Sequence, residues 1–448
     1  MEIIRKITSF AVVTVLSTTA FSADLMQLYR EAVVNDSQMA ISKSKHRASE
    51  EIVPQAMSML LPTVVFTANT SSQKLNSEIE GNSALFSASQ TIDESYSSNG
   101  YQLSISQPLF NADRWLNYQN AKQIKQGADI ELQLSKQQLA MRVAEAYFNV
   151  LRAKEALTLA ETEESAYNRQ LDQVKKTYKS GLIAKTDILD TQAAYDTAKI
   201  NRIVAENSLS MSLEALSILT GKPVKVVDGL VETMPILPLV PETESAWILK
   251  AEQNNKLLKI NENSIQVADR ELTRRKAEHL PTLNLTASYA DASNKGYDIY
   301  GNEYKMSTIR LDLTIPVFLG GMTASRVRQA NQYKIQADQG LEYHKRVLHR
   351  NIINLVRLVK TAVLRVKAAE QAVESNKIAL EATKKGYRVG SKNLFELLQS
   401  QRLLFAAQRD YANSRYDYIL SSLNLKMEAG VLSEKDLQKY NKYLKSGI

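Results

Sequence analysis

The chain contains no cysteine and only four histidines among its 448 residues. Without cysteine it can form no disulfide and no thiolate metal site, and the redox state of its compartment stays open. No histidine pair has metal-ligand spacing, and there is no HExxH motif, glycine-rich phosphate loop or serine nucleophile elbow. We therefore expect no catalytic residue, no metal, no cofactor and no enzymatic activity.

Blocks of like charge are also missing, although the net charge is +8. Proteins that bind nucleic acid usually gather their basic residues into a stripe or an arm. Here the charge is spread along the chain, so we expect it to keep a helical surface soluble. The sequence predicts no nucleic-acid partner.

No apolar run is long enough to cross a bilayer as an α-helix. Near the start, Arg5-Lys6 precedes the apolar run Ile7–Leu16, and the small-residue pattern Ala20-Phe21-Ser22 follows. This order is typical of a signal peptide, which we expect over residues 1–22. The alternative, an N-terminal anchor helix, would need a longer apolar run.

Proline is scarce, and its nine positions divide the chain. Because proline breaks helix interiors, the two proline-free gaps, 109–222 and 317–448, are where long helices can form. Between the gaps, three closely spaced prolines indicate a linker at 222–242.

The first gap holds a seam of mainly apolar residues that repeats every 3.5 residues from Leu132 to Tyr178. Only Lys136 and Glu164 interrupt it. A repeat sustained over so many turns predicts a supercoiled helix over about Ala112–Tyr178. At 1.5 Å per residue this helix would be roughly 100 Å long.

The seam returns in the second gap after a shift of 209 residues. Even Lys136 finds a counterpart, Lys345, although the sequence leaves open whether these two side chains face inward or outward. The same shift carries Tyr178 to Tyr387, Gly181 to Gly390 and Gly221 to Gly430. We therefore predict an internal duplication. The expected segments are a first repeat at 23–221, a second repeat at 243–430 and a C-terminal segment at 431–448.

Each repeat is expected to follow one plan: a first helix, two strands separated by a polar loop, the long helix, a turn at Gly181 or Gly390, and a returning helix. The expected first helices are 24–58 and 243–278, the first strands Val64–Thr70 and Leu283–Tyr289, the loops 71–98 and 290–306, and the second strands Leu103–Leu109 and Leu311–Val317. The second strands alternate apolar and polar residues, which predicts one apolar face.

Four strands in one chain leave two open sheet edges, which lipid does not tolerate and which invite aggregation in water. Little apolar sequence remains to cover the sheet with helices. We therefore favour closure of a barrel by several chains. The alternative is a water-exposed sheet that caps a coiled coil.

Several segments resemble the TolC family of trimeric outer-membrane channel-tunnels, and the resemblance extends over nearly the whole chain after residue 22. The segments that carry it are Ala23–Tyr29, Ala146–Leu151, His279–Ser288, Ile315–Gly321 and Ala412–Tyr418. The resemblance implies a mainly α protein with β-strands, built from duplicated long coiled-coil hairpins. It also implies a homotrimer whose four strands per chain form a 12-stranded barrel in outer-membrane lipid, with the helices continuing as a periplasmic α-barrel.

The resemblance further implies a passive exit duct in the outer membrane of a Gram-negative bacterium. Its cargo would be drugs, a protein exported by type I secretion, or both. Its periplasmic end would be shut until a periplasmic adaptor and an inner-membrane pump, of the ABC or RND type, dock onto it.

Four residues match the family's gating positions. Tyr387 takes the place of a tyrosine whose aspartate partner is Asp187, and a hydroxyl-to-carboxylate bond is charge-assisted. Lys392 replaces the family's gating arginine, with Thr186 as its partner, and lysine lacks the planar fork of arginine. The alternative is that Thr186-Asp187 and Asn393 are ordinary caps of the returning helices.

Two further residues match an acidic ring at the family's periplasmic entrance. Glu396 keeps the first acidic position, whereas Gln399 replaces the second. Because carboxylate rings attract cations, we expect weaker cation selectivity and weaker block by polyvalent cations than two acids per chain would give. The alternative is that Glu396 is a solvated helix charge.

A second class of function competes with the duct, namely a secreted structural coiled coil such as an adhesin stalk. Such a stalk has no need for the duplicated pair of strands. That feature favours the duct.

Overall fold

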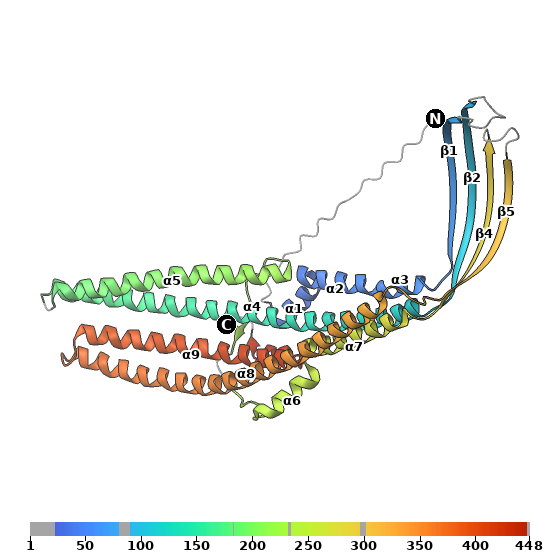
Figure 1. The fold of residues 1–448 in the computed structure, drawn as a ribbon. Coiled ribbons are helices and arrows are strands. Elements are labelled where there is room, and N and C mark those ends of the chain that lie inside the picture. The colour runs from blue at the N-terminus through green and yellow to red at the C-terminus, as the bar shows by residue number, and fades with distance from the viewer. Residues whose placement is uncertain (1–22, 80–89, 182, 232–233, 296–301, 446–448) are drawn as a thin grey trace, which may run out of the picture. The chain divides into compact units, whose positions relative to one another are not determined.

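The computed structural model describes residues 23–79, 90–181, 183–231, 234–295 and 302–445, so the expected signal peptide at 1–22 lies outside it. The same order of elements occurs twice (Figure 1). The first set is α1 (Leu25–Asn35), α2 (Ser37–Glu50), α3 (Ile52–Ser58), β1 (Thr63–Ile79), β2 (Gln90–Asn111), α4 (Ala112–Lys179) and α5 (Lys185–Thr220). The second set is α6 (Glu244–Asn254), α7 (Lys256–Ala277), β4 (Thr282–Lys295), β5 (Asn302–Thr314), α8 (Met322–Arg388) and α9 (Leu394–Glu428).

The first helix of each repeat is interrupted, and the prediction of one continuous helix is wrong in both. Asp36 separates α1 from α2 with extended backbone, and its carboxylate accepts the Met39 N–H and two hydrogen bonds from Arg142. At the equivalent place Asn255 separates α6 from α7 and donates its amide to the Glu428 carbonyl. In each case the single residue at the break bonds through its side chain to a helix distant in the sequence.

The strands are longer than predicted, and the described parts of the two expected loops are mostly strand. β1 and β2 pair without a break out to Ile79 and Gln90, and β4 and β5 pair out to Asn294 and Asn302. Ladder hydrogen bonds join backbone groups, so polar side chains did not stop them. β5 also ends at Thr314, before the predicted limit, because Pro316 cannot donate to a ladder.

The four strands form one antiparallel sheet in the order β1-β2-β4-β5, so β1 and β5 are its edges (Figure 1). Successive rungs across the sheet alternate between apolar and mainly polar side chains. One rung runs Val64–Ile105–Ala287–Ile309, and the next runs Val65–Ser104–Ser288–Thr308. No described residue covers the apolar face, where Ile309 is 81% exposed. The alternation predicted for the second strands is therefore confirmed within β2 and β5.

The long helix of each repeat is observed as predicted, 68 residues in α4 and 67 in α8. The seam lies inward along α4, where its buried members are Leu139, Val143, Val150, Ala153, Ala160, Tyr167, Leu171 and Val174. Of its two interruptions, Glu164 accepts a hydrogen bond from Arg202 of α5 at 2.6 Å, whereas Lys136 is exposed.

The chain divides into two compact units. The sheet unit consists of Lys43–Leu132 and Lys256–Arg346 and contains the four-stranded sheet. The hairpin unit contains α5, α9 and the parts of α4 and α8 that follow Leu132 and Arg346. No helix among the described residues is both long and apolar enough to cross a membrane.

The expected linker also forms ordered structure within the hairpin unit. Its strand β3 (Gly229–Leu230) pairs with β6 (Leu444–Lys445), which follows α10 (Glu434–Asn441) near the C-terminus. Beside them, Tyr147 of α4 donates its hydroxyl to the Asp228 carbonyl at 2.8 Å. These contacts anchor the linker and the C-terminal segment to the helices.

Candidate functional site

The site predicted from the sequence lies where each helical hairpin turns. Gly181 between α4 and α5 has a φ of 75°, and Gly390 between α8 and α9 has a φ of 77°. Only glycine adopts this left-handed conformation at low cost. Both glycines donate their N–H three residues back, to the carbonyls of Tyr178 and Tyr387.

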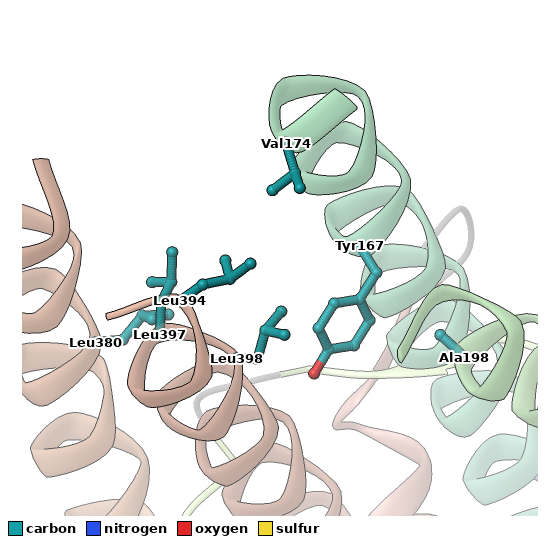
Figure 2. Close-up of a cluster of buried hydrophobic side chains, with 7 residues drawn as sticks. All are labelled: Tyr167, Val174, Ala198, Leu380, Leu394, Leu397 and Leu398. Carbon is teal, nitrogen blue, oxygen red and sulfur yellow. The ribbon is translucent and has the colours of Figure 1, made fainter. Parts of the chain in front are cut away.

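A cluster of buried apolar side chains lies close to these turns and draws on both hairpins (Figure 2). We call it the apolar cluster. Its members are Tyr167 and Val174 of α4, Ala198 of α5, Leu380 of α8, and Leu394, Leu397 and Leu398 of α9. Burial of such side chains away from water stabilises the packing of one hairpin against the other without fixing a direction.

Tyr387 packs at the edge of the apolar cluster, and Asp187 is close enough to act on it. Burial raises the pKa of the Tyr387 hydroxyl, and the negative charge of Asp187 raises it further. Within the described residues the two side chains interact through charge, with no hydrogen bond between them. Asp187 is the third residue of α5, where the helix dipole stabilises a carboxylate.

The other two predicted latch residues, Lys392 and Thr186, do not contact one another in the described structure. Lys392 donates to Glu396 Oε1, with a distance of 2.5 Å from Nζ. The stem of Lys392 folds over Gly386, where an added Cβ would lie 2.7 Å from its Cγ. Thr186 is exposed in the first turn of α5, and the described structure contains no bond between it and Lys392.

Glu396 has a second local role, because it closes a capping box with Asn393. The Asn393 side chain accepts the Glu396 N–H, and Glu396 Oε2 accepts the Asn393 N–H, both at 2.9 Å. The hydrogen bond from Lys392 and then that from Asn393 lower the pKa of Glu396. The cap at Asn393, which was the alternative interpretation, is thus confirmed. The expected cap at Thr186-Asp187 is wrong, since the N-cap of α5 is Ala184.

Gln399 lies half-buried on the wall of a groove of about 550 Å³ between α4, α5 and α9. Charged groups from three helices also line this groove, among them Glu163, Asp190, Arg402 and Arg409. Among the described residues no cluster of three or more His, Asp or Glu side chains could hold a metal ion. The contacts observed at the site are apolar packing, charge interactions and hydrogen bonds.

Polar contacts between the two hairpins were missed by the sequence interpretation. Arg409 of α9 donates to Glu163 of α4 at 2.8 Å, and Tyr416 of α9 donates to Glu155 of α4 at 2.7 Å. The partners lie 246 and 261 residues apart, and no local pattern signals such pairs.

Comparison with known proteins gives a consistent result. A sequence model of the family described as "Outer membrane efflux protein" matches residues 28–222 and again residues 247–431. The outer membrane protein TolC of Vibrio cholerae is 33% identical over 96% of this chain and 96% of its own length. The alkaline protease secretion protein AprF of Pseudomonas aeruginosa is 27% identical over 96% of this chain and 89% of its own.

The fold matches solved structures as well. A crystal structure of CusC, described in connection with folding and transmembrane channel formation, superposes with a TM-score of 0.77 at 18% identity, covering 92% of both chains. The structure of VceC from Vibrio cholerae gives a TM-score of 0.73 at 15% identity over 91% of this chain and 96% of its own. At such identities the agreement concerns the fold alone.

Proposed function

The chain belongs to the outer membrane efflux protein family, and from this we propose that it is a passive exit duct across the outer membrane and the periplasm. As a member of this family it is an outer-membrane channel of a Gram-negative cell and not an enzyme. The alternative of a secreted stalk is therefore wrong.

The observation that carries the proposal is the union, in one chain, of a sheet with an uncovered apolar face and two long helical hairpins. Strands β1 and β5 have no partner on their outer sides within the described chain. Open edges are disallowed in lipid. Three copies, each placing β5 beside β1 of the next, would form a closed barrel of twelve strands.

The hairpin ends supply the gate in this proposal. The apolar cluster holds the α8–α9 hairpin against the α4–α5 hairpin. Tyr387 and Asp187 form the latch, because a modest shift would let the hydroxyl donate to a carboxylate that already acts on its pKa. Lys392 is instead held by Glu396, which favours Tyr387–Asp187 as the principal latch.

The partners are a periplasmic adaptor and an inner-membrane pump of the ABC or RND type, since a passive duct needs an outside source of energy. The matching family is described by the word efflux, and two relatives named for protease secretion match over most of their length. The proposal therefore covers small molecules and a protein cargo. Deleting the gene and scoring both antibiotic sensitivity and secreted proteins separates the two.

The duct itself is tested by the state of the protein in the cell envelope and by its conductance. We expect a trimer in outer-membrane fractions that dissociates on heating, and discrete single channels when the purified trimer is added to a planar bilayer. A soluble monomer, or a trimer that never conducts, would contradict the proposal.

A further inference from the structure

Behind the apolar cluster, further from the turns, side chains of α4 and α9 meet in a series of polar contacts. Arg409 donates to Glu163, and seven residues further along α9 Tyr416 donates to Glu155. Next, Asp417 accepts from Arg152 at 2.7 Å. Because α4 belongs to the first repeat and α9 to the second, each contact joins one hairpin to the other.

These contacts differ in burial, and burial decides which one is hard to break. The Glu163 side chain is 6% exposed, whereas Arg152 and Asp417 are 33% and 39% exposed. Exposed ion pairs contribute little, because water and salt replace the partner. A buried carboxylate that loses its only partner stays desolvated, which strongly disfavours that state. Of the two ion pairs, Glu163–Arg409 is therefore the one that better resists separation of the two helices.

The pair also lies at the inner limit of the apolar cluster. Glu163 precedes Tyr167 by one helical turn, and both line the same groove as Arg409. Burial and the charge of Glu163 raise the pKa of Tyr167 to about 12, while Arg402 and Arg409 act in the opposite direction. Arg402 is thus near, yet it makes no hydrogen bond or ion pair within the described chain. Figure 2 shows the Tyr167 ring between α4 and α9.

We propose that the Glu163–Arg409 pair is a second clamp on the gate, which limits how far α9 can separate from α4 when the hairpin ends open. Between Leu394 and this pair the contacts of α9 with α4 are mainly apolar and set no direction. The ion pair is directional and fixes one point of α9. This inference rests on the proposed function.

The clamp position has a geometric consequence. From Leu394 to Arg409 the length of α9 free to swing is roughly 22 Å, at 1.5 Å per residue. Without the clamp, the next contact is Tyr416–Glu155, seven residues further along α9. The free length would then grow by about 10 Å, or nearly one half.

The test is the closed-state conductance of the purified trimer in planar bilayers. Glu163→Gln keeps the size of the side chain and removes its charge, and Arg409→Gln removes the partner. We expect both to raise the time spent open by on the order of tenfold. Arg409→Gln leaves the buried Glu163 carboxylate without its partner, and Glu163→Gln removes the charge that holds Arg409, whose side chain is 39% exposed. Matched controls are Glu381→Gln, in an exposed pair on α8, and Arg402→Gln, in the same groove; both should behave as wild type.

Exchanging the two charges of the pair distinguishes loss of the clamp from a general loss of packing. The double variant Glu163→Arg with Arg409→Glu should return the channel to its closed conductance. If Glu163→Gln conducts like Glu381→Gln, the clamp is refuted. Should Glu163→Gln fail to assemble, the reversed pair decides: closed channels support the clamp, and widely open ones contradict it. A wild-type trimer that never conducts would refute the proposed function instead.

Discussion

Lys392 and Glu396, four positions apart, neutralise one another, with Nζ 2.5 Å from Oε1. The sequence analysis had assigned Lys392 to the gating latch and Glu396 to the entrance ring. The expected latch thereby loses a cation that could reach another hairpin. The expected entrance ring keeps its carboxylate but gains a positive charge beside it. The entrance of the proposed duct would then carry almost no net charge from these two positions.

Replacing Lys392 with glutamine should strengthen the attraction of the entrance for cations. The change leaves Glu396 without its counter-charge, and the pKa of Glu396 rises towards its ordinary value while the group stays ionised at neutral pH. We expect higher cation selectivity and block at lower concentrations of a trivalent cation, measured in single-channel recordings. Lys384→Gln, in an exposed pair with Glu381, is the control and should change neither property.

Replacing Gln399 with aspartate should act in the same direction. It adds a second carboxylate per chain, and one nearby charge at a protein surface alters cation affinity by on the order of tenfold. Gln399→Asn, which shortens the side chain without adding charge, is the matched control. Recordings in which Gln399→Asp shows the selectivity and block of Gln399→Asn would refute the entrance-ring prediction.

Tyr387→Phe should loosen the gate. It removes the hydroxyl that Asp187 acts on while it keeps the ring in the apolar cluster. In the proposed latch this hydroxyl would donate to Asp187. Loss of a hydrogen bond to a charged group, about 1.5 kcal/mol, corresponds to roughly a tenfold rise in the open fraction. Tyr178 occupies the equivalent place in the first repeat and is 41% exposed, so Tyr178→Phe should leave conductance unchanged. Equal effects of the two variants would count against the latch.

Asp36→Asn should destabilise the hairpin unit in a pH-dependent way. Burial alone would raise the pKa of Asp36, but the hydrogen bonds from Arg142 and Met39 and the charge of Arg142 hold it below its ordinary value of 3.8. A lowered pKa means that the stabilisation is complete above 3.8 and is lost as the pH falls further. At neutral pH the variant should lose about 3 kcal/mol, because Arg142 is left without its partner.

Thermal unfolding followed by circular dichroism between pH 7 and pH 2 checks this sign. The gap in melting temperature between wild type and Asp36→Asn should narrow only in the acidic part of that range. A gap that is the same at pH 7 and pH 2 would show that the carboxylate charge is not what stabilises the break between α1 and α2.

Two glycines with similar backbone angles should respond very differently to alanine. Gly390 has no neighbour within 4 Å of an added Cβ, so Gly390→Ala should cost only the left-handed strain, about 1–2 kcal/mol. At Gly430 a Cβ would overlap the Asn254 carbonyl and lie 2.7 Å from the Asn255 Cα, and the backbone cannot yield cheaply. Gly430→Ala should cost about 4 kcal/mol or more and reduce the yield of folded trimer. Equal melting temperatures for the two variants would contradict the predicted clash at Gly430.

The sequence was most informative where the signal is local and repeated. The 3.5-residue seam predicted α4 to within one residue at its C-terminal end, and the glycines predicted where the chain turns. The Lys392–Glu396 pair and the Asn393 capping box could also have been predicted, because the partners in both are at most four positions apart.

Features that depend on distant partners were out of reach. No sequence pattern near Asp36 indicates that Arg142, 106 residues away, bonds its carboxylate at a break between two helices. The predicted strand lengths were too short for a related reason, because they depend on pairing between distant segments. Backbone pairing between β1 and β2 continues through residues whose polar side chains suggested a loop. Glu163 and Arg409 belong to the same class, because α4 and α9 meet only in the folded chain.

The unequal strand pairs record how the duplicated halves have diverged. Pro281 follows Pro62 by 219 residues, but Pro316 follows Pro108 by only 208, so the strand-to-strand span of the first half is 11 residues longer. Part of the extra length lies in β1 and β2, whose pairing continues past the last β2–β4 rung at Ser97–Lys295. The fold therefore accommodates two different strand lengths at this end of the sheet, and an epitope tag placed there should leave assembly intact.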